Sequence, residues 1–243
     1  MPKHRFIGEF NLKQTQVSVT EKNLIHQIIN VLRLQKEDEV FLVNEGKQEA
    51  IAKIKEIKPE KITFELQDVY KNKKEPSLNV TLYLAILKKD NFEISAQKAT
   101  EVGIKKIVPV ITKRTIKKNV NCNRINKITK EAAEQSGRAI IPNLTKINNF
   151  KEAIEKASQE NDFNLFFDLK TDSFFDFKFN QKLSKNSKIG VFIGPEGGWS
   201  KEEKELAEEN KFYLTNLGKL TLRAETSVII AGYLAVNSIK FKI

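Results

Sequence analysis

From residue 78 onward, short apolar runs alternate with stretches of helical spacing, and this alternation leaves the chain few possible folds. Residues 80–87 form a nearly continuous apolar run, as expected of a strand that is buried on both faces. Later apolar runs predict further strands at 107–111, 165–169, 189–193 and 212–217. Helical spacing predicts helices at 91–102, 123–137, 150–158 and 225–239. The alternation predicts an α/β domain with a mostly parallel sheet that is covered on both faces.

The residues before this domain have a different pattern, one that is rich in strands. Strands are predicted at 39–43, 48–57 and 62–69, with one short helix that Thr20 is expected to cap. A small module of this kind predicts a compact barrel. The polar stretch 71–77 contains a proline and marks the boundary, so we expect domains at 1–72 and 73–243.

Charge indicates a polyanionic partner, most simply nucleic acid, because the 243 residues carry a formal net charge of +11. A proteome-wide bias towards Lys, Asn and Ile would explain the same charge without a partner. One cysteine (Cys122) excludes an internal disulfide, and with two histidines it cannot complete a structural zinc site. No apolar run approaches the roughly 18 residues of a membrane span. We therefore expect a cytoplasmic protein with neither a metal nor a membrane partner.

Glycine is concentrated in the loop Gly194-Pro195-Glu196-Gly197-Gly198, which holds three of the chain's 10 glycines. A predicted strand leads into this loop, and Ser200 with Glu203 has the spacing of a capping box, so a helix should begin near residue 201. Backbone N–H groups and positive partial charge collect at such a helix start. The pattern predicts a ligand-binding loop, although an ordinary strand-to-helix turn also favours glycine.

The common nucleotide-binding motifs are absent from the sequence. There is no Gly-x-x-x-x-Gly-Lys-Ser/Thr, which argues against a P-loop. No Gly-x-Gly-x-x-Gly follows the first strand of the second domain, which argues against a Rossmann dinucleotide site.

Arg223 is unusual because it lies at the predicted start of the last helix, where a cation opposes the helix dipole. Local stability would favour the opposite charge, so a functional demand is one explanation. The other is an ion pair with Glu225 that closes the helix end.

Three groups of residues together resemble the SPOUT superfamily of RNA methyltransferases, and more narrowly the family that methylates N3 of one uridine in small-subunit ribosomal RNA. They are the glycine loop, the Leu217-Gly218 step and the run Leu222-Arg223-Ala224-Glu225-Thr226. Ala224 departs from the threonine expected there. The resemblance continues through residues 97–103, Pro109, residues 131–138, Arg5-Phe6, His26 and residues 31–33.

The resemblance implies that residues 1–72 form a PUA-like β-barrel that binds RNA. It also implies that residues 73–243 form a SPOUT-type domain whose chain is threaded into a deep trefoil knot. The methyl donor, S-adenosylmethionine, would be held by a loop after the strand near Leu169 and by two further loops. Donor-binding residues implied in those two loops are Gly194, Pro195, Glu196, Gly197, Gly198, Leu217, Gly218 and Leu222.

The family acts as a homodimer, and the last helix is a candidate packing surface because Ala231, Gly232 and Ala235 would allow close approach. The implied partner is 16S ribosomal RNA, within the small ribosomal subunit. The candidate RNA contacts are Arg5, His26, Arg33 and Arg114, with further basic residues at 113, 117, 118 and 124.

Methylation of uridine N3 requires two aligned reactants and stabilisation of the charge that develops on the flanking carbonyl oxygens. Arg223 is the first candidate for this guanidinium, and Arg138, from either subunit, is the second. Glu225 would orient Arg223 or assist proton removal, whereas Glu196 is expected to hold its own loop through hydrogen bonds. Two alternatives stay open: a non-catalytic RNA-binding or ribosome-assembly protein, and a methyltransferase for another RNA site, such as one in transfer RNA.

Overall fold

The computed structural model describes residues 4–44, 48–176 and 183–241, which belong to two compact units. The first unit combines Met1–Glu75 with a returning segment, Ala133–Ile140. The second combines Pro76–Ala132 with Ile141–Ile243. The sequence boundary predicted between residues 72 and 73 lies near this division, but the sequence pattern did not predict the returning segment.

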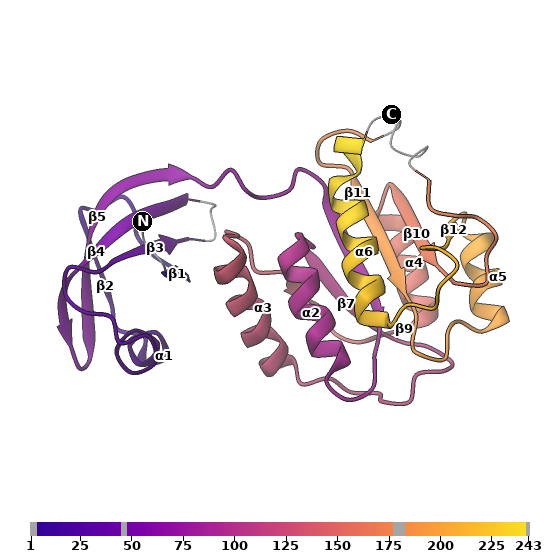
Figure 1. The fold of residues 1–243 in the computed structure, drawn as a ribbon, viewed down its shortest axis with the longest axis horizontal. Helices are drawn as coiled ribbons and strands as arrows, with labels where there is room; N and C mark the ends of the chain where they lie inside the picture. Colours follow the sequence, from indigo (N-terminus) through magenta and orange to yellow (C-terminus); the bar gives the residue numbers. More distant parts are fainter. Residues whose placement is uncertain (1–3, 45–47, 177–182, 242–243) are drawn as a thin grey trace. The chain divides into compact units, whose positions relative to one another are not determined.

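The first unit contains a five-stranded sheet in which β1 and β3 are parallel and the other neighbours are antiparallel (Figure 1). Its apolar face buries Phe6, Ile54 and Phe64 completely or nearly so. In spatial order the strands are β1 (His4–Ile7), β3 (Glu39–Val43), β4 (Gln48–Lys58), β5 (Lys61–Lys71) and β2 (Gln16–Val19).

A short helix packs into the core of this unit, as predicted. It consists of α1 (Lys22–His26) and one π-helical turn, η1 (Gln27–Val31), and it buries Leu24, Ile25 and Ile28. The residue at its N-cap is Glu21, which makes no capping hydrogen bond through its side chain. The predicted cap at Thr20 was therefore wrong by one residue.

The second unit is built on a seven-stranded sheet in which every pair is parallel, which confirms the predicted mostly parallel sheet. The main path runs β12 (Tyr213–Thr215), β10 (Phe163–Phe167), β11 (Lys188–Ile193), β6 (Asn79–Ala85), β7 (Lys106–Ile111) and β8 (Asn143–Leu144), and β9 (Asn148–Asn149) also pairs with β7.

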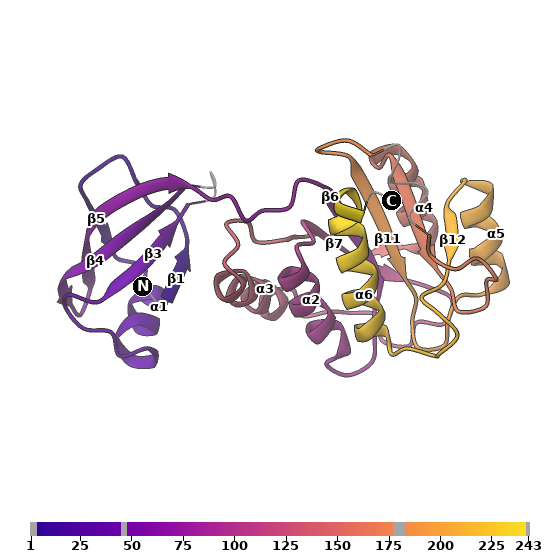
Figure 2. The same cartoon turned by 45° about the horizontal axis from the view of Figure 1, so that its top comes forward.

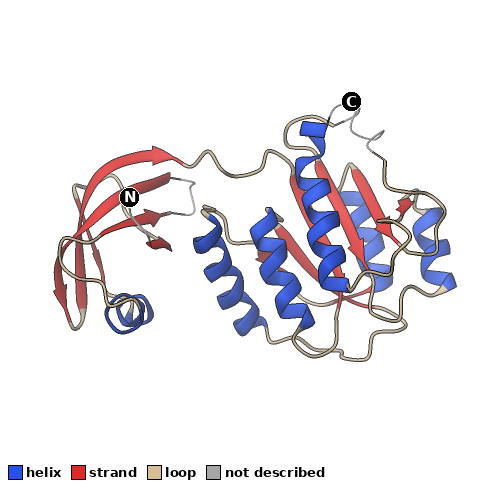
Figure 3. Cartoon of the chain, in the orientation of Figure 1, coloured by secondary structure: helices blue, strands red, loops and turns tan. Residues whose placement is uncertain are grey.

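Helices cover both faces of this sheet (Figures 1 and 2). On one face lie α2 (Asn91–Val102) and α6 (Ala224–Asn237), followed by η3 (Ser238–Phe241); on the other lie α4 (Phe150–Glu160) and α5 (Lys201–Glu209). Side chains alternate along the central strand, so that Val191 and Ile193 pack with the first pair of helices and Phe192 packs with the second. The result is a three-layer α/β/α domain (Figure 3).

Several helix ends follow the capping signals in the sequence. Gly103 ends α2 with φ 107°, and the capping box of Ser200 and Glu203 starts α5 at Lys201. Helix α3 (Cys122–Ser136) begins earlier than predicted. The side chain of Asn121 accepts the Arg124 N–H at 3.1 Å and so caps this earlier start. The predicted cap at Asn123 was wrong because Asn123 is already inside the helix.

The small residues of α6 pack inside the chain and not on its surface. Ala231 and Ala235 are fully buried, and a Cβ atom at Gly232 would lie 3.1 Å from Val102 Cγ2 on α2. The prediction that these residues form a packing surface for a second subunit is therefore wrong. Instead, Ile229 and Tyr233 are the large apolar side chains that α6 exposes among its described residues.

Candidate functional site

The glycine loop leaves β11 and has a geometry that requires small residues at two positions. Gly198 has φ 69°, in the left-handed region that L side chains rarely adopt, and its N–H donates to Pro195 O at 2.8 Å. Gly194 has another constraint, since a Cβ atom there would lie 2.9 Å from Trp199 Cε2. The Trp199 indole is buried and donates to Phe167 O at 2.9 Å, so it ties the glycine loop to the end of β10.

A second loop, after β12, faces the first. Asn216 orders its start, because its side chain donates to Thr171 O at 2.7 Å and accepts the Gly218 N–H at 2.9 Å. Leu217 packs on the main core of the unit, whereas Leu220 is 78% exposed. This loop leads directly to Arg223 at the N-cap of α6.

A third loop follows β10 and contributes a buried carboxylate. The Asp168 side chain is 8% exposed, and its Oδ2 atom lies 3.2 Å from Lys204 Nζ in an ion pair. Among the described residues this oxygen accepts no hydrogen bond. The ion pair with Lys204 compensates the charge of this buried oxygen, and Asp168 as a residue is part of the cavity lining.

The three loops enclose one cavity of about 270 Å³ at the carboxyl ends of β10, β11 and β12. This edge is where open α/β sheets bind their ligands. Every donor-binding residue implied by the sequence lines the cavity: Gly194, Pro195, Glu196, Gly197, Gly198, Leu217, Gly218 and Leu222. Further lining residues, which the sequence did not indicate individually, include Asp168, Trp199, Asn216 and Ser227.

The start of α5, just after the glycine loop, is held by charged side chains. Glu203 accepts the N–H groups of Lys113 and Ser200 at 2.7 and 2.8 Å. The pKa of the Glu202 carboxyl is lowered to about 2. The largest cause is a hydrogen bond from the backbone N–H of Glu202, and hydrogen bonds from the side chains of Lys113 and Ser200 add to it. Glu202 is therefore ionised at neutral pH, as suits a helix N-terminus.

The side chains of Glu196 and Arg114 each form a hydrogen bond with the backbone of a neighbouring loop. Glu196 Oε1 accepts the Lys88 N–H at 3.0 Å, as expected of a residue that holds the loop by hydrogen bonds. Arg114 Nη1 donates to Gly197 O at 2.6 Å. The sequence placed Arg114 in a basic run, but the spacing could not show that it lies against the glycine loop.

The Arg223 side chain is 87% exposed at the start of α6, and its neighbours Leu222 and Ala224 line the cavity. Its Nη1 atom is 3.9 Å from Glu225 Oε1, which is too long for a hydrogen bond. The ion pair with Glu225, which is the alternative that the sequence offers, is therefore present but long, and it leaves most of the guanidinium exposed. This guanidinium is available to a ligand, and its catalytic role stays a prediction.

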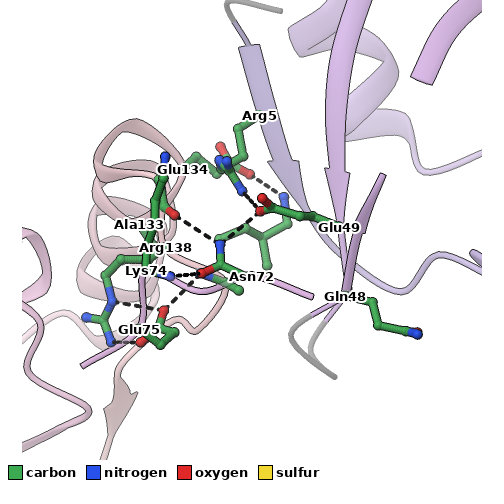
Figure 4. Close-up of polar contacts among 12 residues, drawn as sticks. Arg5, Gln48, Glu49, Asn72, Lys74, Glu75, Ala133, Glu134 and Arg138 are labelled. Carbon is green, nitrogen blue, oxygen red and sulfur yellow. Dashed lines mark hydrogen bonds and ion pairs between the residues drawn. The ribbon is translucent and has the colours of Figure 1, made fainter. Parts of the chain in front are cut away.

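Arg138 belongs to the first unit, where it is buried at the end of the returning segment (Figure 4). Its Nη2 and Nε atoms lie 3.2 and 3.4 Å from the Glu75 carboxylate, which also accepts the N–H groups of Ala139 and Ile140. These contacts give Arg138 a structural role. Its predicted catalytic role is not supported by them and stays a prediction.

Arg5 is also engaged within the first unit, where it pairs with Glu49 (Figure 4). Its guanidinium carbon also lies 4.8 Å from the centroid of the Phe41 ring. Burial of Glu49 would raise the pKa of its carboxyl, but hydrogen bonds from Arg5 and Asn72 outweigh burial and lower this pKa. Arg5 is thus held structurally, whereas His26 and Arg33 are exposed. RNA contact by all three stays a prediction.

Among residues 4–44, 48–176 and 183–241, no group of three His, Cys, Asp or Glu side chains is placed to bind a metal ion. Nor does any described helix combine the length and apolarity needed to cross a membrane.

Two protein-family models match the chain. The model of an RNA methyltransferase domain covers residues 73–235, and that of an RNA methyltransferase PUA domain covers residues 22–67.

Individual relatives agree with these matches. The ribosomal RNA small subunit methyltransferase E of Rickettsia conorii is 31% identical over 93% of this chain and 91% of its own. The protein with the same name from Mesomycoplasma hyopneumoniae is 34% identical over 68% of this chain and 72% of its own. The crystal structure of ribosomal RNA small subunit methyltransferase E from Neisseria gonorrhoeae, bound to S-adenosyl methionine, has a TM-score of 0.85 and 27% identity, over 98% of this chain and 99% of its own.

Proposed function

The chain belongs to the ribosomal RNA small subunit methyltransferase E family of RNA methyltransferases, and from this premise we propose its reaction. The protein transfers the methyl group of S-adenosylmethionine to N3 of one uridine in 16S ribosomal RNA. The single observation that carries the proposal is the cavity formed by the three loops at the carboxyl ends of β10, β11 and β12.

The lining of this cavity fits the donor. Glycine-rich backbone brings N–H groups to the ligand, and Leu217 and Leu222 offer apolar surface for a purine. Asp168 adds a carboxylate to the lining, which suits a hydroxyl or a cationic group of the donor. When bound, S-adenosylmethionine supplies a methyl group that is already activated by its sulfonium. The three loops have to hold this methyl group in line with the uridine nitrogen.

Arg223 is the residue that we assign to the developing charge. Removal of the N3 proton spreads negative charge over the two flanking carbonyl oxygens, and a fixed guanidinium beside them lowers its cost. The exposed side chain between Leu222 and Ala224 supports this role, because both neighbours line the cavity. Glu225 lies near enough to limit the orientations of Arg223. Arg138 is the second candidate, and its pairing with Glu75 makes it the weaker one.

The RNA would contact both units. In the first unit, residues 1–72 act as the PUA-like RNA-binding domain, with His26 and Arg33 as exposed contacts and Arg5 as a less accessible one. In the second unit, Arg114 and the lysines near it would bind phosphates. Such contacts make RNA affinity fall steeply with salt.

Three further features belong to the same proposal. The protein acts as a homodimer, and the exposed Ile229 and Tyr233 of α6 are the apolar surface that favours this assembly. It works in the cytoplasm on rRNA of the small subunit. The chain of the methyltransferase domain, residues 73–243, is threaded as a trefoil knot.

The test is mass mapping of modified nucleotides in 16S rRNA from a strain that lacks the gene. We expect 3-methyluridine to disappear from one site, to return with the wild-type gene and to stay absent with Arg223→Ala. A matched control is Lys188→Ala, because Lys188 lies at the opposite end of β11 from the glycine loop and its variant should restore the modification. Persistence of 3-methyluridine in the deletion strain would refute the substrate. Calorimetric titration of the purified protein with S-adenosylmethionine separates the enzyme from a non-catalytic RNA-binding protein, which would bind no donor.

A further inference from the structure

Two loops beside the glycine loop carry exposed basic residues. One follows β6 and the other follows β7, and both emerge at the same edge of the sheet as the cavity, since β6, β7 and β11 run in parallel. Lys117 Nζ lies 3.3 Å from Lys89 O, which brings the two loops together. Their exposed cationic residues are Lys88, Lys89, Lys113, Arg114, Lys117 and Lys118, which we call the basic edge.

Arg114 is the member of the basic edge that bonds to the wall of the cavity. Besides the 2.6 Å hydrogen bond to Gly197 O, its Cβ and Cδ atoms lie 3.4 Å from where a Gly197 Cβ would be, so the side chain lies along the loop. It stays exposed, and in the described structure the other N–H groups of its guanidinium have no partner. One part of the guanidinium thus holds the loop, and the rest is presented in a fork that matches a phosphate.

The peptide of Gly197 lies between two points that are already fixed. On one side Glu196 accepts the Lys88 N–H, and on the other the capping box of Ser200 and Glu203 starts α5. Among the described residues, Arg114 is the hydrogen-bond partner of the Gly197 carbonyl. The position of this carbonyl, and of the cavity wall that it belongs to, therefore depends on where the Arg114 side chain is.

We propose that Arg114 is a positioning residue that couples RNA binding to donor binding. A phosphate of the RNA, bound to the outer N–H groups of Arg114, restricts the guanidinium to the rotamer that holds Gly197. The cavity is then ordered before the donor enters, so RNA raises the affinity for the donor. The inference rests on the proposed function, because it presumes that this cavity takes S-adenosylmethionine and that the basic edge contacts RNA.

The coupling has to work in both directions, because a change in binding free energy between two sites is reciprocal. If RNA tightens donor binding by some factor, the donor tightens RNA binding by the same factor. Couplings of this kind are about fivefold or larger. For one charge-assisted hydrogen bond we expect about five- to tenfold.

The experiment is calorimetric titration of the full chain with S-adenosylhomocysteine, which cannot react, with and without a 16S rRNA fragment that contains the target uridine. In the wild type the fragment should lower the Kd by about five- to tenfold. Arg114→Ala should weaken binding without RNA and abolish the effect of RNA. Arg114→Lys, which keeps the charge and a donor, should recover part of both.

Two controls separate coupling from loss of charge. Lys118→Ala removes a charge of the basic edge that, within the described structure, forms no hydrogen bond to the glycine loop. It should weaken RNA binding while the coupling factor stays at its wild-type value. Lys188→Ala, at the other end of β11, should change neither quantity. Thermal unfolding shows whether each variant is folded. If Arg114→Ala is not folded, Arg114→Lys takes its place as the test variant.

The outcomes distinguish this inference from the proposed function. Wild-type protein that binds S-adenosylhomocysteine and methylates 16S rRNA, but shows the same Kd with and without RNA, would overturn the coupling alone. The coupling would also be overturned if RNA lowered the Kd of Arg114→Ala for S-adenosylhomocysteine by the same factor as in the wild type. Wild-type protein that binds no S-adenosylhomocysteine would overturn the proposed function.

Discussion

Replacement of Gly194 by alanine tests the geometry of the cavity wall most directly. The added Cβ would lie 2.9 Å from Trp199 Cε2, 3.1 Å from Nε1 and 3.2 Å from Cδ2. The indole has little room to retreat, because it is 5% exposed, its ring centroid lies 4.5 Å from that of Phe166, and its Nε1 donates to Phe167 O. Gly194 does not have a positive φ, so the expected penalty is steric and not conformational.

The magnitude follows from these contacts. Forcing one extra carbon into a packed site costs about 1–3 kcal/mol, and loss of the indole hydrogen bond adds about 0.5–1.5 kcal/mol. We expect Gly194→Ala to lower the free energy of unfolding by about 2 kcal/mol. Gly194, Trp199 and Phe167 all line the cavity, so the same movement should raise the donor Kd about tenfold, the equivalent of about 1.4 kcal/mol.

The assay is urea unfolding and donor titration of four proteins: wild type, Gly194→Ala, Trp199→Leu and the double variant. A leucine side chain ends at its Cδ atoms, so it has no counterpart of the Cε2 and Nε1 atoms that the new Cβ would strike. Gly194→Ala should therefore cost at least about 1 kcal/mol less in the Trp199→Leu background, a coupling typical of residues in contact. Wild-type stability in Gly194→Ala, or additive effects in the double variant, would refute the steric reasoning.

Three more predictions concern charged residues. Arg223→Ala should keep the Kd for the methyl donor and lose about 10²- to 10³-fold in kcat, as when an enzyme loses one preorganised hydrogen-bond donor. Single-turnover methylation measures this loss, and near-normal turnover would exclude Arg223 from the mechanism. Arg138→Met should cost about 3 kcal/mol in urea unfolding, because it leaves the Glu75 carboxylate buried without its cation; a change below about 1 kcal/mol would show that the pair is unimportant. The pKa of Glu49 is lowered in the folded state, so its carboxylate stabilises the fold at pH values above its ordinary pKa of 4.5. This stabilisation is lost as the pH falls from 4.5 through the folded-state pKa. Glu49→Gln should therefore flatten the decline of stability at acidic pH, and an unchanged pH profile would contradict this assignment.

Much of the methyltransferase domain could be predicted from the sequence, because local spacing determines which segments form helices and buried strands. Helix α2 has the predicted bounds and ends at Gly103, and the capping box at Ser200 starts α5 where expected. Short elements were harder to predict. The two-residue strands β8 and β9 are too short to show a periodic pattern. By residue type alone, Asn121 and Asn123 are equally suitable N-caps for α3.

The candidate site could be predicted in its loops but not in its side-chain partners. Glycine and proline mark the glycine loop locally. The loops after β10 and β12 were indicated as donor loops by the family resemblance, and the parallel strands bring the three together at one edge of the sheet. Pairing depends on contacts between distant segments, which spacing does not contain. The bonds of Arg5 to Glu49 and of Arg138 to Glu75 join residues 44 and 63 positions apart. The burial of Ala231 and Ala235 against the chain itself could not be predicted for the same reason. The knot stays a prediction.

The returning segment Ala133–Ile140 has a consequence for how the protein is made. Ile7 N–H donates to Glu134, Asn72 donates to Gly137 O, and Glu75 accepts from Arg138 and the two residues after it. During synthesis the first 75 residues leave the ribosome well before these partners have been translated. The N-terminal module therefore cannot reach its final state as an independent early intermediate, and its completion has to wait until more than half of the polypeptide has emerged.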